Sequence, residues 1–182
     1  NSVARFQANW RRLGLKLFKF DITSTNSTLR NLFPPSYANW TKVSSFDVVT
    51  PTPSPELFHA SYGSWSNLVT LSAWNNAFSG SLPSEYKNWT SISTFDVGGN
   101  FLSGTLPPEY SAWGGIFLFS VRTNNLSGTL PPQYGAWTEI DTFRVANNNM
   151  LVGTLPASYG AWAQATQIYL YNANFSGSIP DS

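Results

Sequence analysis

The sequence contains no cysteine and few charged residues, and both absences exclude classes of function. Without cysteine the fold has no disulfides, no thiolate nucleophile and no cysteine-based zinc site. Charged residues make up 10% of the 182 residues, and the 10 Lys and Arg nearly balance the 9 Asp and Glu. Because a nucleic-acid-binding protein needs a basic surface to displace counterions from phosphates, we expect no nucleic-acid partner. We also expect no cofactor.

Long hydrophobic runs are missing as well, because Gly, Asn, Ser or charged residues interrupt each apolar stretch. None approaches the roughly 18 to 20 apolar residues of a membrane-spanning helix, so no membrane span is predicted in this segment. The first residues have neither an initiator Met nor the features of a signal peptide. We expect any targeting sequence to have been removed or to lie outside the segment.

An internal repeat marked by tryptophan is the main positive feature. Six Trp residues are spaced by 25, 24, 24, 24 and 25 residues: Trp40, Trp65, Trp89, Trp113, Trp137 and Trp162. Each is followed by an apolar-x-apolar triplet, such as Phe95-Asp96-Val97, which is typical of a short, half-buried strand. An Asn and a Ser-Gly-x-Leu-Pro segment complete most of the units.

One such unit cannot bury its apolar side alone, whereas stacked units turn each apolar position into a continuous column of core. Gly and Pro mark the outer side of the coil, and Pro-Pro-x-Tyr leaves room for no more than one helical turn. The pattern therefore predicts a right-handed solenoid with a short-strand parallel sheet on its inner face and little helix. An Asn column is expected inside the turns, where side-chain amides satisfy backbone groups of successive units: Asn76, Asn100, Asn124 and Asn148.

These motifs resemble the leucine-rich repeat, in particular the 24-residue type with a Leu-x-Gly-x-Ile-Pro segment that is familiar from plant receptors. The segment Gly-Thr-Leu-Pro-Pro-Glu-Tyr at 104–110 is also similar to surface-antigen repeats of kinetoplastid protists, in which Gly-Thr-Leu-Pro-Pro-Glu-Trp recurs. The resemblance covers residues 33–182 and implies a leucine-rich repeat fold, although repeat scaffolds carry many unrelated functions. Trp and Phe stand where the family usually has Leu.

Residues 33–182 are predicted to form about six repeats of 24–25 residues, in an array that is open at the C-terminus. The unit beginning at Trp40 lacks the Asn and carries a Pro-rich segment at 49–55, where we expect a local bulge. Residues 1–32 fit the repeat loosely, although Phe20-Asp21-Ile22 has the strand pattern. We interpret them as either a degenerate first repeat or an N-terminal cap.

The ends of a solenoid expose a cut core and normally carry polar caps. Two interpretations stay open here: the segment belongs to a longer chain, or the chains stack head to tail and cap one another. Residues 1–91 hold 8 basic and 4 acidic residues, which gives +4, whereas residues 92–182 hold 2 basic and 5 acidic residues, which gives −3. Such complementary ends favour self-association, and contacts of this kind that do not close form filaments.

Five Asn-x-Ser/Thr sequons predict N-linked glycans: Asn26, Asn39, Asn88, Asn125 and Asn174. Two of them directly precede a repeat Trp and three follow a strand triplet by four residues, and both places should face away from the core. With few charges and no Cys, the sequons indicate an extracellular or cell-surface protein. The alternative is that they are ordinary turn residues in a repeat that favours Asn and Ser.

The inner face of a solenoid is its usual recognition surface. Outward-facing aromatic side chains with Arg close by can bind a protein or a sugar, so they define a candidate ligand-binding site. The alternative is that the aromatic rings only pack on their neighbours. Most residues expected on this face are small and polar, and the candidate ligand-binding residues are Trp74, Asp96, Arg122, Arg144, Tyr169 and Tyr171.

No catalytic residues and no metal site are predicted. Asp47 and Asp96 should lie roughly 10 Å apart across two strand spacings, near the separation of an inverting glycosidase pair. Nothing in the pattern buries either carboxylate, however. His59, the only histidine, takes the place of a repeat Pro and has no second metal ligand or nucleophile in register.

We therefore predict a non-catalytic extracellular scaffold or surface-coat protein that is N-glycosylated and stacks end to end into a filament. The alternative is a recognition module that binds a protein or glycan ligand on its concave face.

Overall fold

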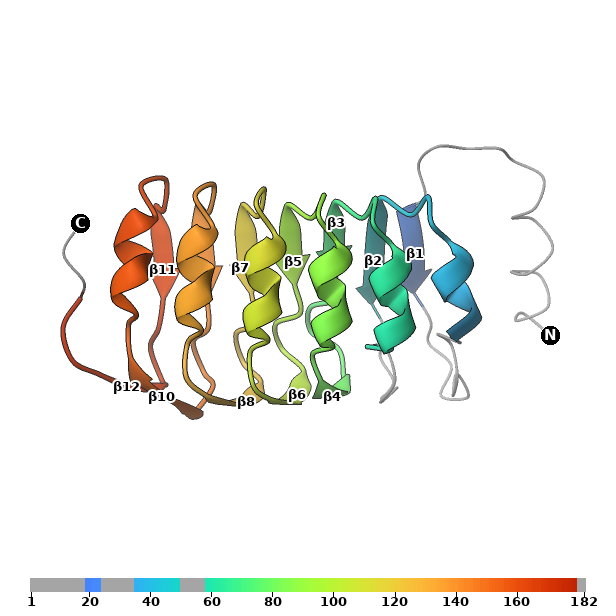
Figure 1. The fold of residues 1–182 in the computed structure, drawn as a ribbon. Coiled ribbons are helices and arrows are strands. Elements are labelled where there is room, and N and C mark those ends of the chain that lie inside the picture. The colour runs from blue at the N-terminus through green and yellow to red at the C-terminus, as the bar shows by residue number, and fades with distance from the viewer. Residues whose placement is uncertain (1–18, 24–34, 50–57, 180–182) are drawn as a thin grey trace.

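A row of stacked coils, here called rungs, makes up the computed structural model, which describes residues 19–23, 35–49 and 58–179 (Figure 1). Seven parallel strands, one from each rung, form a sheet in the order β1-β2-β3-β5-β7-β9-β11. Equivalent residues of successive rungs are paired, as Phe95 is with Phe119 and Phe119 with Phe143. The strands are β1 Lys19–Thr23, β2 Ser45–Val49, β3 Thr70–Ser72, β5 Thr94–Asp96, β7 Leu118–Ser120, β9 Thr142–Arg144 and β11 Gln167–Tyr169.

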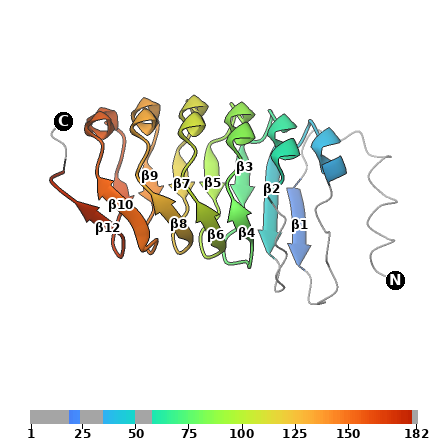
Figure 2. The same cartoon turned by 60° about the horizontal axis from the view of Figure 1, so that its bottom comes forward.

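A second parallel sheet, which the sequence analysis did not predict, runs along another side of the coil in the order β12-β10-β8-β6-β4 (Figure 2). It is built from the Ser-Gly segments, which resemble turns in sequence. The Gly in each segment has a positive φ, as at Gly104 and Gly128, so the chain bends there after only a few paired residues. The strands are β4 Ser79–Ser81, β6 Phe101–Gly104, β8 Asn125–Gly128, β10 Met150–Thr154 and β12 Asn174–Ser176.

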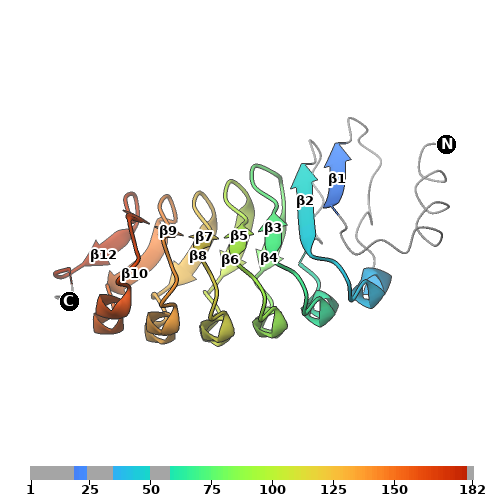
Figure 3. The ribbon, with the colours of Figure 1, turned by 90° about the horizontal axis from the view of Figure 1, so that it is seen from above.

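Short 3₁₀ helices of five residues line the side opposite the seven-stranded sheet (Figure 3). The expectation of little helix is confirmed for the described residues. Each helix from η3 onward ends where the Trp amide N–H donates to the carbonyl of the Tyr three residues earlier, as Trp113 does to Tyr110. The helices are η2 Pro35–Asn39, η3 Ala60–Ser64, η4 Ser84–Asn88, η5 Pro108–Ala112, η6 Pro132–Ala136 and η7 Ala157–Ala161.

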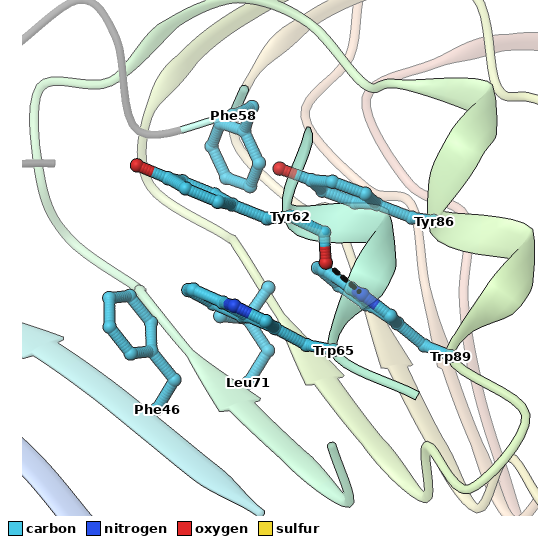
Figure 4. Close-up of a pocket in the computed structure, with 7 residues that line it drawn as sticks. All are labelled: Phe46, Phe58, Tyr62, Trp65, Leu71, Tyr86 and Trp89. Atoms are coloured by element: carbon cyan, nitrogen blue, oxygen red, sulfur yellow. Dashed lines mark hydrogen bonds between the residues drawn. The ribbon is translucent and has the colours of Figure 1, made fainter. Parts of the chain in front are cut away.

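The predicted Trp column is the centre of the core. Consecutive rings are nearly parallel, with centroids 6.3–6.4 Å apart from Trp65 to Trp162. Each of these indole N–H groups donates to a Tyr carbonyl of the preceding rung, and the pair drawn in Figure 4 is Trp89 with Tyr62, at 2.8 Å. From Tyr86 onward, each repeat Tyr hydroxyl donates to a backbone carbonyl one rung back, as Tyr134 does to Pro107 at 2.9 Å. The large rings are thus buried with their polar atoms satisfied.

The predicted Asn column also forms, and Asn124 illustrates its bonding. The Nδ2 group donates to the carbonyls of Val121 in its own rung and Val97 in the preceding rung, at 3.0 and 3.1 Å. Its Oδ1 accepts from the N–H of Leu102 at 2.9 Å. Asn100 and Asn148 bond in the same way. One side chain therefore satisfies backbone groups of two rungs.

Two sequence expectations fall largely on residues outside the described ranges. These are the bulge at 49–55 and the degenerate repeat or cap at 1–32. Within the second region, β1 contains the Phe20-Asp21-Ile22 triplet and pairs in register with β2. The division of the chain near residue 32 stays a prediction.

Replacing Asn124 with Ala should lower the free energy of unfolding by about 2 to 4 kcal/mol, because buried carbonyls and one buried N–H lose their partner. Asn125→Ala is the matched control, since the neighbouring side chain is exposed. Urea unfolding of protein made in bacteria would measure both changes. Equal losses in the two variants would contradict the role given to the Asn column.

The buried tyrosines predict a pH limit to stability. Burial raises the pKa of Tyr86, Tyr110 and Tyr134 well above the usual value near 10. The free energy of unfolding should therefore be constant as far as these tyrosines are concerned below pH 10. It should fall as the pH rises above 10, because these hydroxyls ionise there only in the unfolded chain. Phenolate absorbance and circular dichroism should report these residues ionising together with unfolding. Full ionisation of all tyrosines in a still-folded protein would contradict this.

Candidate ligand-binding face

The inner face is the side of the seven-stranded sheet that points away from the helices. Strand alternation puts Phe95 and Val97 in the core and leaves Asp96 half-buried on this face. The strand register places Ser120 beside Asp96 and Arg144 beside Ser120. Residues two positions further along the chain, such as Trp74 and Arg122, extend the same face.

Three predicted residues come together at the end of the face formed by β9 and β11. The guanidinium of Arg144 lies 5.1 Å from the ring centroid of Tyr169, a cation–π contact. Gln167 supports both side chains, since its Oε1 accepts from Arg144 Nη2 at 3.2 Å and from the Tyr169 hydroxyl at 3.1 Å. Tyr171 meets Tyr169 edge to face, with centroids 6.5 Å apart. We call Arg144, Gln167, Tyr169 and Tyr171 the aromatic–Arg cluster.

The aromatic–Arg cluster is open to solvent, although its side chains contact one another. Tyr169 is 37% exposed and Tyr171 is 55% exposed. Gln167 is not among the binding residues predicted from the sequence. The available signal in the sequence was that Gln167 precedes Tyr169 by two residues, so both side chains lie on the same face of the strand.

A second group lies around Gly98, two rungs from Arg144. The Asp96 carboxylate accepts a hydrogen bond from the Gly98 N–H at 3.0 Å. A Cβ at Gly98 would lie 2.9 Å from Arg122 Cγ and 3.2 Å from Asp96 Oδ1. The missing side chain therefore makes room for the stem of Arg122. The signal in the sequence was a glycine at the repeat position that Trp74 and Arg122 occupy in the neighbouring units.

Ser120 lies between the two groups and is fully buried. Its Oγ has no hydrogen-bond partner, which is unusual for a buried hydroxyl. The hydroxyl lies below the surface of the face, between Asp96 and Arg144 in the strand register. Trp74, on the rung before Gly98, is 47% exposed.

Four of the five sequon side chains are exposed, namely Asn39, Asn88, Asn125 and Asn174. The first two are the last residues of η2 and η4, and the other two begin β8 and β12. Neither position belongs to the inner face. Asn26 falls outside the described residues.

The residues considered for catalysis have structural or solvent-exposed surroundings. Asp47 and Asp96 are separated by β3 and are only half-buried. His59 caps η3, because its Nδ1 accepts from the Ser61 N–H at 3.1 Å, whereas Pro83 and its equivalents make no side-chain cap. Among residues 19–23, 35–49 and 58–179, no three His, Asp or Glu side chains are grouped as metal ligands. No helix in these ranges is long and apolar enough to cross a membrane.

Comparison with known proteins identifies the fold but no sequence relative. No protein-family model matches the chain, and no curated protein sequence does. Among solved structures, the plant peptide hormone receptor RGFR1 in complex with RGF2 is 21% identical with a TM-score of 0.77, over 81% of this chain and 23% of that one. A TDR receptor is 24% identical with a TM-score of 0.77, over 90% of this chain and 30% of the receptor.

The Arabidopsis receptor kinase HAESA, in complex with the peptide hormone IDA and the co-receptor SERK1, is also similar. It is 23% identical with a TM-score of 0.77, over 89% of this chain and 27% of that one. The chain therefore spans less than a third of the length of each of these three receptors. These similarities, together with the parallel strands and the repeated core, show that the fold is a leucine-rich repeat solenoid, as the sequence predicts.

Proposed function

We propose that this chain is a non-catalytic extracellular recognition module that binds an extended peptide segment of a protein ligand on its inner face. The aromatic–Arg cluster carries the proposal. Tyr and Arg are the residue types that dominate binding energy at protein interfaces. Because Gln167 holds Arg144 and Tyr169 in place before binding, little side-chain freedom is lost on association. RGFR1 and HAESA in complex with peptide hormones offer a parallel for a peptide ligand on this fold.

The charges on the inner face suggest how such a peptide would lie. Asp47 stands on β2 and Asp96 on β5. Arg122 follows β7 by two residues, and Arg144 is the last residue of β9. A peptide that crosses the strands would therefore place basic groups near β2 to β5 and acidic groups near β7 to β9. An uncharged glycan ligand, the other possibility from the sequence, would not use this separation of charge.

An extracellular location belongs to the same proposal. The exposed sequons at Asn39, Asn88, Asn125 and Asn174 support N-glycosylation in the secretory pathway. Since none of them lies on the inner face, glycans at these positions would leave the ligand-binding surface accessible.

Peptides selected from a random display library on the glycosylated protein provide the test. Arg144→Ala and Tyr169→Ala should each weaken binding of a selected peptide at least tenfold, measured by biolayer interferometry. Lys87→Ala and Glu109→Ala on η4 and η5 are matched controls that should bind as the wild type does. Unchanged binding by both inner-face variants would show that this cluster is not the ligand site.

The second candidate is an end-to-end scaffold, as in a surface coat, and the opposite net charges of residues 1–91 (+4) and 92–182 (−3) favour it. Ile168 is 47% exposed, although its equivalents Phe95, Phe119 and Phe143 are fully buried. A rung from a second copy could stack on Ile168 as each rung does on the next. The similarity of residues 104–110 to protist surface-antigen repeats is consistent with such a coat.

Stacking predicts concentration-dependent filaments that an added charge at Ile168 would prevent. Ile168→Asp should abolish filaments in electron micrographs, because the carboxylate would have to lose its water in the contact. Tyr169→Ala should leave the filaments intact. A wild-type protein that stays monomeric at high concentration would exclude the scaffold.

A further inference from the structure

Three large apolar side chains are exposed on the outer face of the second sheet. Phe101 is 59% exposed, Met150 is 53% exposed and Val152 is 41% exposed. Leu102 and Leu151, which alternate with them along β6 and β10, are completely buried, so the exposed residues point to the opposite side of the sheet. We call Phe101, Met150 and Val152 the apolar strip. Met150 and Val152 are same-face neighbours on β10, and Phe101 lies across β8 from them. A group of exposed large apolar side chains on one face of a sheet often marks a surface that another group covers.

Two sequons lie next to residues of the apolar strip. Asn125 pairs with Ser103 on β6, which is two residues after Phe101. On its other side, Ser127 pairs with Met150 of β10, so Met150 is a diagonal neighbour of Asn125 as well. With strands about 4.8 Å apart and same-face residues about 6.6 Å apart, each diagonal is roughly 8 Å. Asn125 therefore lies between two apolar side chains.

Asn174 is even closer to the strip, because it pairs directly with Val152 on β10. Its Nδ2 donates to the Asn149 carbonyl at 2.6 Å. A glycosylated asparagine keeps one N–H on this nitrogen, so the bond is compatible with an attached sugar. The bond would also fix the direction in which the sugar leaves the side chain.

We propose that N-glycans attached to Asn125 and Asn174 pack back onto the apolar strip through the C–H faces of their first sugar rings. Attachment joins Nδ2 to the anomeric carbon of a lipid-diphosphate-linked oligosaccharide. The bond from that carbon to the phosphate oxygen breaks, the lipid diphosphate leaves, and the nitrogen loses one proton. The inference rests on the proposed secretion and glycosylation. It assigns two of the glycans a further role, which is to cover exposed apolar side chains.

The sugar ring suits this surface. One side of a pyranose ring carries mainly C–H groups, which pack on aromatic and aliphatic side chains, while its hydroxyls remain in water. Such packing would remove Phe101 and Met150 from water without a protein partner. Asn88 is the internal comparison, because it ends η4 on another side of the coil, away from both diagonals.

The test uses protein secreted from a eukaryotic cell that performs N-glycosylation, with occupancy of each sequon measured by mass spectrometry. A double-mutant cycle combines Asn125→Gln with Phe101→Ser, and the melting temperature is the readout. Asn125→Gln should lower the melting temperature by about 2 to 4 °C, because the sugar contact is lost. In the Phe101→Ser background the same change should have almost no effect.

The controls separate the glycan from the side chain and from the fold. Asn125→Gln in unglycosylated bacterial protein should leave the melting temperature unchanged, and Asn88→Gln should give the same shift with or without the Phe101→Ser substitution. Empty sequons at all of these positions would refute the proposed glycosylation itself. Occupied sequons with additive effects would overturn only the packing of the glycan. Dimerisation of the glycosylated protein that Phe101→Ser abolishes would also overturn it, because a second copy would then cover the strip.

Discussion

The fold depends on hydrogen bonds that each rung must make to the rung before it. The indole N–H of Trp113 donates to the Tyr86 carbonyl, and the Tyr110 hydroxyl donates to the Pro83 carbonyl. These groups lie in a dry core, where an unpaired donor or acceptor is costly. A rung can therefore stack in only one register, and this register also aligns the Asn column and both sheets. The aromatic stack contributes apolar burial, while the hydrogen bonds determine where each ring must lie.

This constraint fixes most of each repeat and leaves two surfaces free to vary. The core positions keep the same residue type from rung to rung because every side chain meets its own equivalent in the neighbours. The inner face and the outer face of the second sheet have no such requirement. Arg144 and Tyr169 occupy the same position as Ser72 and Ser120, and Phe101 occupies the same position as Asn125. Specific functions can therefore be placed on these surfaces without disturbing the stack.

The sequence predicted those features that a period and a residue type determine together. The Trp column, the Asn column and the scarcity of helix all follow from the 24-residue spacing, and the structure confirms them. The second sheet was missed because Ser-Gly-x-Leu-Pro resembles a turn, and only stacking turns it into paired strands. The Tyr hydroxyl bonds and the Arg144–Gln167 contact were missed as well, because both join residues more than 20 positions apart. Position alone indicated that Arg144 and Tyr169 share a face, but it could not show that Gln167 would hold them.

The locations of the two proposed surfaces also make them compatible. Among the residues that the structure describes, every sequon lies on a 3₁₀ helix or on the second sheet, and none on the seven-stranded sheet. Glycans are bulky and well hydrated, so they would obstruct a ligand only if they grew from the inner face. In a coil with several sides, attachment at Asn125 and Asn174 instead keeps the sugars on a side that the proposed ligand does not use. The same rung geometry that repeats the core thus separates a surface for recognition from a surface for solubility.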